Sequence, residues 1–166
     1  MAVRTLRRSD GPGNLSAVDD VFDYAVRNAT PDVGATLQWL IEQGAAMTRQ
    51  QGGERESFGN VLLEFTLDDA VLTITRDRGQ WMLDVQCGEL RRFDFDVIHA
   101  AFHGIDPWAM HDGFAVLPKQ LPDGVSWLAE IPSALAWLRS TADVEDRLTL
   151  LQRRRGETLF GPLPGQ

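Results

Sequence analysis

Hydrophobic residues follow two different periods along this chain, and each period predicts a type of secondary structure. From residue 16 to residue 47 the apolar side chains recur at the spacing of one α-helical face. From residue 58 to residue 87 they alternate with polar side chains, as in β-strands with one buried face. After residue 96 the helical spacing returns. This order predicts an α+β fold.

Two helices are expected before the strands. Ser16, with an acidic residue three positions later, is typical of a helix N-cap, and Thr30 followed by Pro31 is typical of a second helix start. The apolar stripe of the second helix continues as far as Met47. The polar residues 49–57 that follow are expected to form a loop.

Three strands are predicted from the alternating residues 58–66, 70–75 and 81–87, and a fourth from residues 89–95. Because short turns join them, neighbouring strands are expected to be antiparallel. The predicted architecture is an antiparallel three- to four-stranded β-meander packed against N-terminal and C-terminal helices.

The stretch "TRDRGQW", residues 75–81, is the densest cluster of charge, glycine and aromatic side chains. Its "RDRG" segment fits a type I turn with Gly79 in the left-handed conformation, a three-residue hairpin loop with a bulge. Trp81 is then expected on the packed face of the sheet, while Arg76 and Arg78 stay solvated. Because no histidine, nucleophile or metal-ligand set is close in sequence, we interpret the stretch as a turn and not as a catalytic loop.

Three helices are expected after the strands. Asp96 begins the first and Pro132 the second, and Ser140 or Thr141 caps the third. The arginines at 153–155 are predicted to lie in the last turn of the third helix, where the helix dipole favours positive charge.

Breaker residues delimit one domain. Residues 1–14 and 161–166 are expected to be tails, and residues 15–160 a single α+β domain. Within that domain, residues 104–124 have no regular period and are long for a loop, which is typical of functional segments.

The composition is typical of a globular cytoplasmic protein. Hydrophobic residues make up 43% of the 166 positions, enough to bury one core. Cys87 is the only cysteine, which excludes an internal disulfide and fits a reducing compartment. No apolar run approaches the roughly 20 residues of a membrane span, and the N-terminal residues lack the apolar segment of a secretory signal. We therefore expect a cytoplasmic location and no membrane binding.

Acidic residues dominate the middle of the chain. Between Ser9 and Gln152 there are 10 basic and 23 acidic residues, a balance of −13 within a chain of net charge −8. Such a surface repels phosphate backbones, so we expect no nucleic-acid binding. It favours a basic protein partner by steering the encounter, although many soluble domains are acidic without such a partner.

Few residues are arranged as a catalytic or metal-binding set. His99 and His103 are four positions apart on a predicted helix, so both lie on one face. A metal bound there needs a further ligand, for which the candidates are Asp106, His111 and Asp112. Histidines at this spacing are more often without a ligand role, because the glutamate of a metalloprotease helix is missing. We therefore assign no metal and no cofactor.

Other reactive groups have structural interpretations. Asp68 and Asp69 are a turn signal, and Asp96 caps a helix. Cys87 follows the alternation of a buried strand with no basic neighbour in sequence, so an inert thiol is expected. Phosphate-binding glycine loops and the serine-nucleophile motif are absent from the sequence. The chain is therefore not expected to be an enzyme.

The run from residue 57 to residue 85 resembles a segment of small actinobacterial proteins that are similar to immunity proteins of polymorphic toxin systems. The recurring parts are Phe58-Gly59-Asn60 at the start of a strand and Asp77-Arg78-Gly79-Gln80-Trp81 at the hairpin. The resemblance implies a non-enzymatic protein that binds a cognate toxin and occludes its active site or substrate path.

A small acidic domain without a catalytic set suits an inhibitor of a basic toxin, since its carboxylates imitate phosphates and speed association. Trp108 is either a contact residue or an anchor of its loop. The residues predicted to contact the partner are Glu89, Asp94, Asp96, Asp106, Trp108 and Asp112.

Two other functions fit the same sequence. A secretion-chaperone-like or scaffold protein is also small, acidic and built from helices and a meander. A small-ligand or metal-dependent enzyme would use the region of His99 and His103. The sequence leaves the oligomeric state open.

Overall fold

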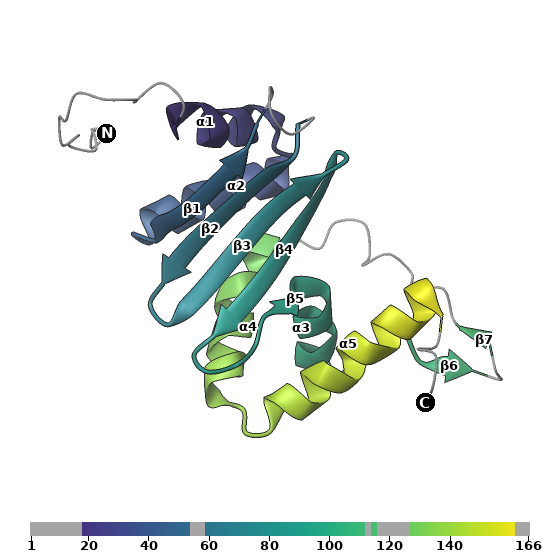
Figure 1. Cartoon of the computed structure of the whole chain (residues 1–166). Coiled ribbons are helices and arrows are strands. Elements are labelled where there is room, and N and C mark those ends of the chain that lie inside the picture. Colours follow the sequence, from purple (N-terminus) through teal and green to yellow (C-terminus); the bar gives the residue numbers. More distant parts are fainter. Residues whose placement is uncertain (1–17, 54–58, 112–113, 116–126, 162–166) are drawn as a thin grey trace.

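The computed structural model describes residues 18–53, 59–111, 114–115 and 127–161 (Figure 1). The helices are α1 (Val18–Asn28), α2 (Pro31–Glu42), α3 (Phe95–Phe102), α4 (Trp127–Ser140) and α5 (Val144–Phe160). The strands are β1 (Ala46–Gly52), β2 (Val61–Leu67), β3 (Ala70–Asp77), β4 (Gln80–Cys87), β5 (Phe93–Asp94), β6 (Met110–His111) and β7 (Phe114–Ala115). The expected tail at 1–14 lies outside the described residues, as does the tail at 161–166 apart from Gly161.

The five strands β1 to β5 form one antiparallel sheet in sequence order, which confirms the α+β meander. Strand β1 was not predicted, because its residues AMTRQQG are polar and do not alternate. It is an edge strand that is mostly exposed, so backbone pairing with β2 holds it without a buried face. The second helix accordingly ends at Glu42, and Met47 belongs to β1. A one-residue register shift between Met47 and Arg49 marks a bulge in this edge.

The hairpin between β3 and β4 differs from the predicted turn. Asp77 pairs directly with Gln80, so the loop holds only Arg78 and Gly79. Both loop residues have positive φ, at 50° and 86°. Two positive φ angles are the pattern of a type I′ turn, whose twist matches that of the flanking strands better than the predicted bulged loop.

Arg76 is half-buried, and not solvated as predicted. Its Nη1 donates to the Gly59 carbonyl oxygen at 2.7 Å and to the Tyr24 hydroxyl at 3.3 Å. The backbone N–H of Arg78 donates to Asn60 Oδ1 at 3.1 Å. These bonds tie helix α1 and the start of β2 to the hairpin. Gly59, Asn60 and Arg78 thus have a role in the fold.

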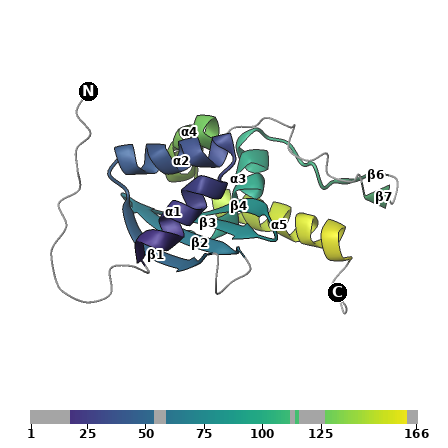
Figure 2. The ribbon, with the colours of Figure 1, turned by 90° about the horizontal axis from the view of Figure 1, so that it is seen from above.

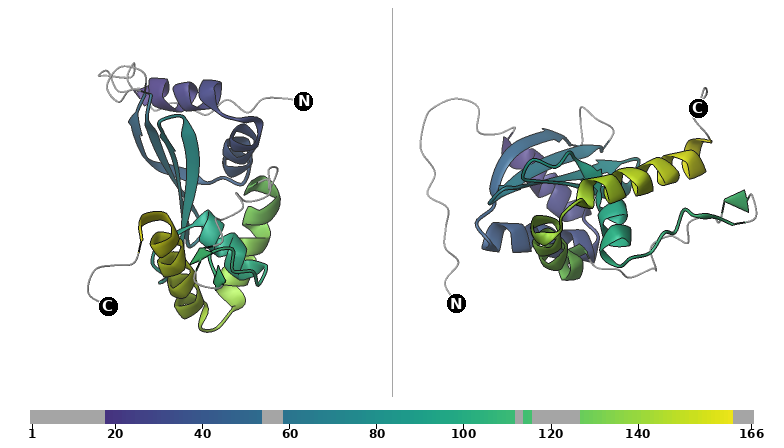
Figure 3. Two further views of the ribbon diagram at one scale, coloured as in Figure 1. Left: turned by 90° about the vertical axis from the view of Figure 1, so that its right-hand side faces the viewer. Right: turned by 90° about the horizontal axis from the view of Figure 1, so that it is seen from below.

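Helices α2 and α4 cover one face of the sheet, and α1 crosses its end near β1 and β2 (Figure 2). Helices α3 and α5 pack together beside β5. In the described part of the chain no helix lies across the middle of the opposite face, which is called the open face below (Figure 3). The β6–β7 pair forms a separate small sheet.

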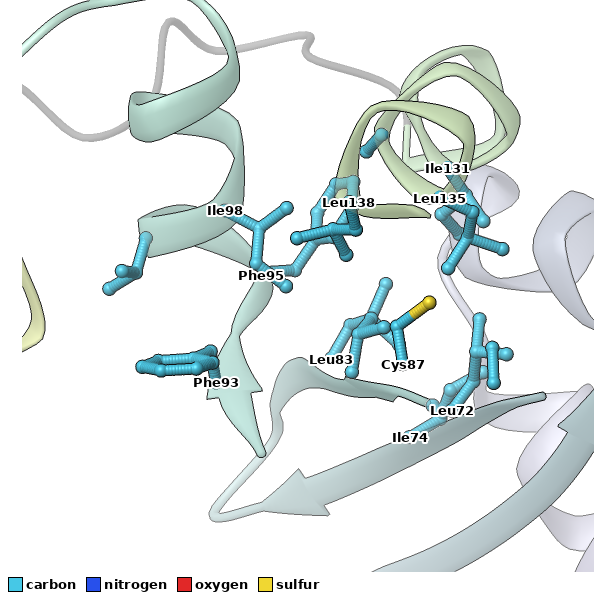
Figure 4. Close-up of a cluster of buried hydrophobic side chains, with 14 of the residues drawn as sticks. Leu72, Ile74, Leu83, Cys87, Phe93, Phe95, Ile98, Ile131, Leu135 and Leu138 are labelled. Carbon is cyan, nitrogen blue, oxygen red and sulfur yellow. The ribbon is translucent and has the colours of Figure 1, made fainter. Parts of the chain in front are cut away.

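The main core lies between the sheet and α4. Leu72 and Leu83 point from the strands toward Leu135 and Leu138 of α4 (Figure 4). Full burial of each such side chain contributes about 1.5–3 kcal/mol to folding. Cys87 lies in the same layer, and burial raises the pKa of its thiol, as an unreactive cysteine requires.

Helix starts follow the sequence signals only in part. Thr30 caps α2 as predicted and accepts a hydrogen bond from the Val33 N–H at 3.4 Å. Asp94, and not Asp96, holds the N-cap position of α3, without a side-chain bond. Pro132 lies inside α4, where it removes one backbone hydrogen bond. The buried residues Ile131, Ala134, Leu135 and Leu138 nevertheless continue the apolar stripe through it.

Helix α5 begins and ends later than predicted. Its N-cap position is Asp143, which has a φ of 56° and makes no side-chain cap bond. The helix continues to Phe160, so the arginines at 153–155 lie in its middle and its last turn has no basic residue. The helix dipole therefore does not explain the position of these arginines. Their ion pairs with acidic side chains explain it.

Candidate functional site

Three carboxylates expected to face a partner are paired with arginines of α5. Asp94 Oδ2 accepts a hydrogen bond from Nη1 of Arg155, whose Nη2 lies 3.8 Å from Asp96 Oδ2. Arg154 pairs with Asp106 in the same way. These carboxylates balance positive charge inside the chain, which the sequence interpretation did not foresee because it placed the arginines at the helix end.

The other predicted contact residues have different surroundings. Glu89 is exposed in the turn after β4. Trp108 is only 5% exposed and packs in the core, and its backbone N–H donates to Asp106 Oδ1 at 3.2 Å. This burial supports the anchor interpretation of Trp108 and removes it from the accessible surface. Asp112 lies outside the described residues.

A row of polar side chains crosses the open face of the sheet. Glu64, Thr73, Asp84 and Asp94 are successive cross-strand partners on β2, β3, β4 and β5, and are called the charged row. Directly paired residues project to the same side of a sheet, so the four side chains form one line. Arg92, just before β5, reaches back across the sheet to Glu64, with an Nη2–Oε2 distance of 3.2 Å.

The centre of the charged row is shielded from solvent. Thr73 is 2% exposed, and its Oγ1 has no hydrogen-bond partner among the described residues. The pKa of Asp84 is raised to about 7, first by burial and then by the hydrogen bond and negative charge of Asp94. Arg92 and Arg155 act in the opposite direction. A protonated Asp84 therefore donates to the Asp94 carboxylate, and the row holds a proton near neutral pH.

A hollow of about 340 Å³ runs along α5. It is lined by residues of α5 and of the loop before β5, among them Arg91, Gln152, Arg153, Gly156, Glu157 and Phe160, and is called the α5 hollow. Gln152 links it to the charged row, because its Nε2 donates to Asp94 Oδ2 at 3.3 Å. Arg91 stacks over the Phe93 ring at 5.0 Å and donates to Thr149 Oγ1, which fixes the wall opposite the helix.

Phe160, at the end of α5, is 88% exposed, and the neighbouring Leu159 is 51% exposed. An exposed ring beside a hollow and arginines has the composition of a protein–protein contact, where aromatic residues and arginine are enriched.

Comparison with protein families, curated proteins and solved structures finds no match to this chain. Among the described residues, no helix combines the length and apolar character needed to cross a bilayer.

The two candidate histidines come together with a glutamate that their spacing did not reveal. His99 lies on α3 and His103 is its C-cap residue, and His103 Nε2 is 3.0 Å from Oε2 of Glu130 on α4. Of the further ligands considered from the sequence, Asp106 pairs with Arg154, and Asp112 lies outside the described residues.

Sequence reasoning missed Glu64, Asp84, Arg92 and Phe160. The alternation of the strands already placed Glu64 and Asp84 on the outward face, so this signal was present in the sequence. Their assembly into a row required the register between strands, which the lengths of the two hairpin loops determine. Phe160 was assigned to the end of the domain, and its exposure follows from the length of α5.

Proposed function

We propose that this protein is a non-catalytic inhibitor that binds a folded toxin domain in the cytoplasm, as an immunity protein does. The partner docks on the α5 hollow, with Phe160 as its main contact and the charged row beside it. The observation that carries this proposal is the 88% exposure of Phe160 at the edge of the hollow. Burying this ring against a partner contributes about 1.5–3 kcal/mol to binding.

Charge supports a basic partner. The chain carries a net charge of −8, whereas the charged row itself is close to neutral, because Arg92 pairs with Glu64, Arg155 pairs with Asp94 and Asp84 retains a proton near neutral pH. A partner cation that approaches Glu64 or Asp94 replaces an internal arginine contact, so charge contributes to orientation and association rate more than to affinity.

The chemistry of the α5 hollow supports binding over catalysis. Within the described residues its lining holds arginines, a glutamate, small polar groups and one aromatic ring, and no nucleophile beside a base. An inhibitor needs no such set, because it acts by covering the surface of its target.

The proposal predicts that the reading frame immediately upstream of this gene encodes a large secreted protein with a toxin domain at its C-terminus, and the test uses that domain. We expect a 1:1 complex by size-exclusion chromatography with light scattering, and protection of cells that express this domain. Phe160→Ala weakens binding by at least tenfold in calorimetry, because hot-spot aromatic residues dominate such contacts. The matched control Leu150→Ala, at a 48% exposed position of the same helix, stays within about twofold.

Two results contradict the proposal. One is the lack of any complex with, and protection from, the neighbouring domain. The other is a complex that binds equally well after Phe160→Ala, which places the contact elsewhere.

A secretion-chaperone-like role is the second candidate, and the exposed pair Leu159 and Phe160 favours it over an enzyme. A chaperone is expected to form a stable homodimer, and Phe160→Ala is expected to convert this dimer to a monomer. The wild-type dimer is expected to bind an unfolded segment of the neighbouring protein. Light scattering of the wild-type chain alone separates the two roles, because the inhibitor is expected to bind its folded target as a monomer.

A further inference from the structure

Three potential metal ligands from two helices converge at one point. His99 lies on α3, His103 is the C-cap residue of α3, and Glu130 lies in the first turn of α4. One ligand atom from each residue lies within 4.8 Å of the other two. Glu130 Oε2 is 3.0 Å from His103 Nε2 and 3.8 Å from His99 Nδ1.

The buried nitrogen of His99 lacks a partner. His99 is 7% exposed, and its Nδ1 makes no hydrogen bond among the described residues. Its separation of 3.8 Å from the glutamate oxygen is too long for a hydrogen bond. A buried polar atom without a partner is costly, so a further group between the nitrogen and the carboxylate would be stabilising at this position.

The distances fit an ion in that position. Zinc binds histidine nitrogen and carboxylate oxygen at about 2.0–2.2 Å, so tetrahedral ligand atoms are about 3.4 Å apart. Glu130 Oε2 lies 3.0 Å from His103 Nε2 and 3.8 Å from His99 Nδ1, so the two distances lie on either side of this value. The ligand atoms of all three residues lie within 4.8 Å of one another, so the side chains must move closer together to reach coordination distance.

We propose that His99, His103 and Glu130 bind a divalent first-row transition metal, with zinc as the best fit, and that the metal joins α3 to α4. Two imidazoles and one carboxylate suit zinc, whereas calcium and magnesium prefer oxygen ligands. Three protein ligands leave one tetrahedral position for water or for a ligand from another molecule. This site uses none of the residues of the α5 hollow, so its test is independent of the proposed function.

The experiment uses tag-free, metal-stripped full-length chain titrated with Zn²⁺ in competition with a chromophoric chelator. We expect one equivalent to bind with micromolar or tighter affinity and to raise the melting temperature, while Mg²⁺ does neither. Co²⁺ is expected to give the intense visible absorption of a tetrahedral nitrogen–oxygen site.

Ligand variants locate the site. His99 is buried, so the informative changes are at the more accessible His103→Ala and Glu130→Gln, each checked for native circular dichroism. Each is expected to weaken Zn²⁺ binding by at least tenfold, while the control Glu145→Gln on α5 leaves it unchanged. Absence of stoichiometric binding overturns the proposal. So does tight binding that both His103→Ala and Glu130→Gln leave intact.

Discussion

The carboxyl groups of Asp84 on β4 and Asp94 on β5 face each other across the sheet and share a hydrogen bond. Two carboxylates in contact repel each other, so a proton retained on Asp84 stabilises the pair. Asp94 in turn holds Arg155 of α5. The proton on Asp84 therefore influences how the last helix docks on the sheet.

Replacing Asp84 with asparagine tests this arrangement through pH. Because the folded-state pKa is raised to about 7, the contribution of Asp84 to stability is fully present below its unfolded pKa and is lost as pH rises through 7. Asp84→Asn keeps a hydrogen-bond donor to Asp94 and does not ionise, so its contribution to stability does not fall as pH rises. We expect the variant to match the wild type at about pH 3 and to exceed it by about 1–2 kcal/mol at pH 8.

Urea unfolding at both pH values measures this difference. A variant that is less stable than the wild type at pH 8 contradicts the arrangement. A difference that does not change with pH does the same.

Gly59 is predicted to be irreplaceable because of its surroundings as well as its backbone. Its φ is 80°, and an added Cβ would lie 2.7 Å from the Tyr24 hydroxyl oxygen. Gly59→Ala is expected to lower the free energy of unfolding by about 2–4 kcal/mol. Gly79→Ala is the matched control, since its φ is 86° but no atom lies within 4 Å of the added Cβ, so a cost of about 1 kcal/mol is expected. If thermal unfolding shows that Gly59→Ala and Gly79→Ala lose the same stability, backbone strain alone accounts for both losses.

Arg155 is expected to contribute more to stability than Arg153, two positions earlier. Arg155→Gln leaves the half-buried Asp94 without its ion pair, at a cost of about 1–2 kcal/mol. Arg153→Gln removes an exposed pair with Glu157 four positions on, and such a pair is worth about 0.3–0.5 kcal/mol. Chemical denaturation measures both, and added salt is expected to reduce the smaller effect first. Reversal of this order contradicts the docking role of Arg155.

Two leucines of α5 lie on different faces of the helix, one on its buried face and one on its exposed face. Leu148 is 0% exposed and Leu150 is 48% exposed. Leu148→Ala is expected to cost about 2–5 kcal/mol through the lost burial and the remaining cavity. Leu150→Ala is expected to change the free energy of unfolding by less than about 0.5 kcal/mol. A small effect at Leu148 would mean that α5 does not pack on the body as described.

The elements with strong local signals were predicted best. The alternation in β2, β3 and β4 and the cap of α2 at Thr30 required only neighbouring residues, and the structure confirms them. Strand β1 was missed because an exposed edge strand has no buried face and so no alternation.

The candidate sites were predicted less well than the fold. The sequence indicated His99 and His103 through their helical spacing, but it gave no reason to add Glu130. It also selected Asp94 and Asp106 as acidic residues without their arginine partners, because charge in a sequence does not reveal what lies opposite it.

The sequence by itself determined the class of fold, the hairpins and the apolar face of most elements, because periodicity and turn chemistry act between residues close in the chain. Only the tertiary structure decided which charges are paired. Arg155 and Asp94 are 61 positions apart, and His103 and Glu130 are 27 apart. Contacts over such separations depend on how helices pack on the sheet, and that packing is set by the shape of the whole core.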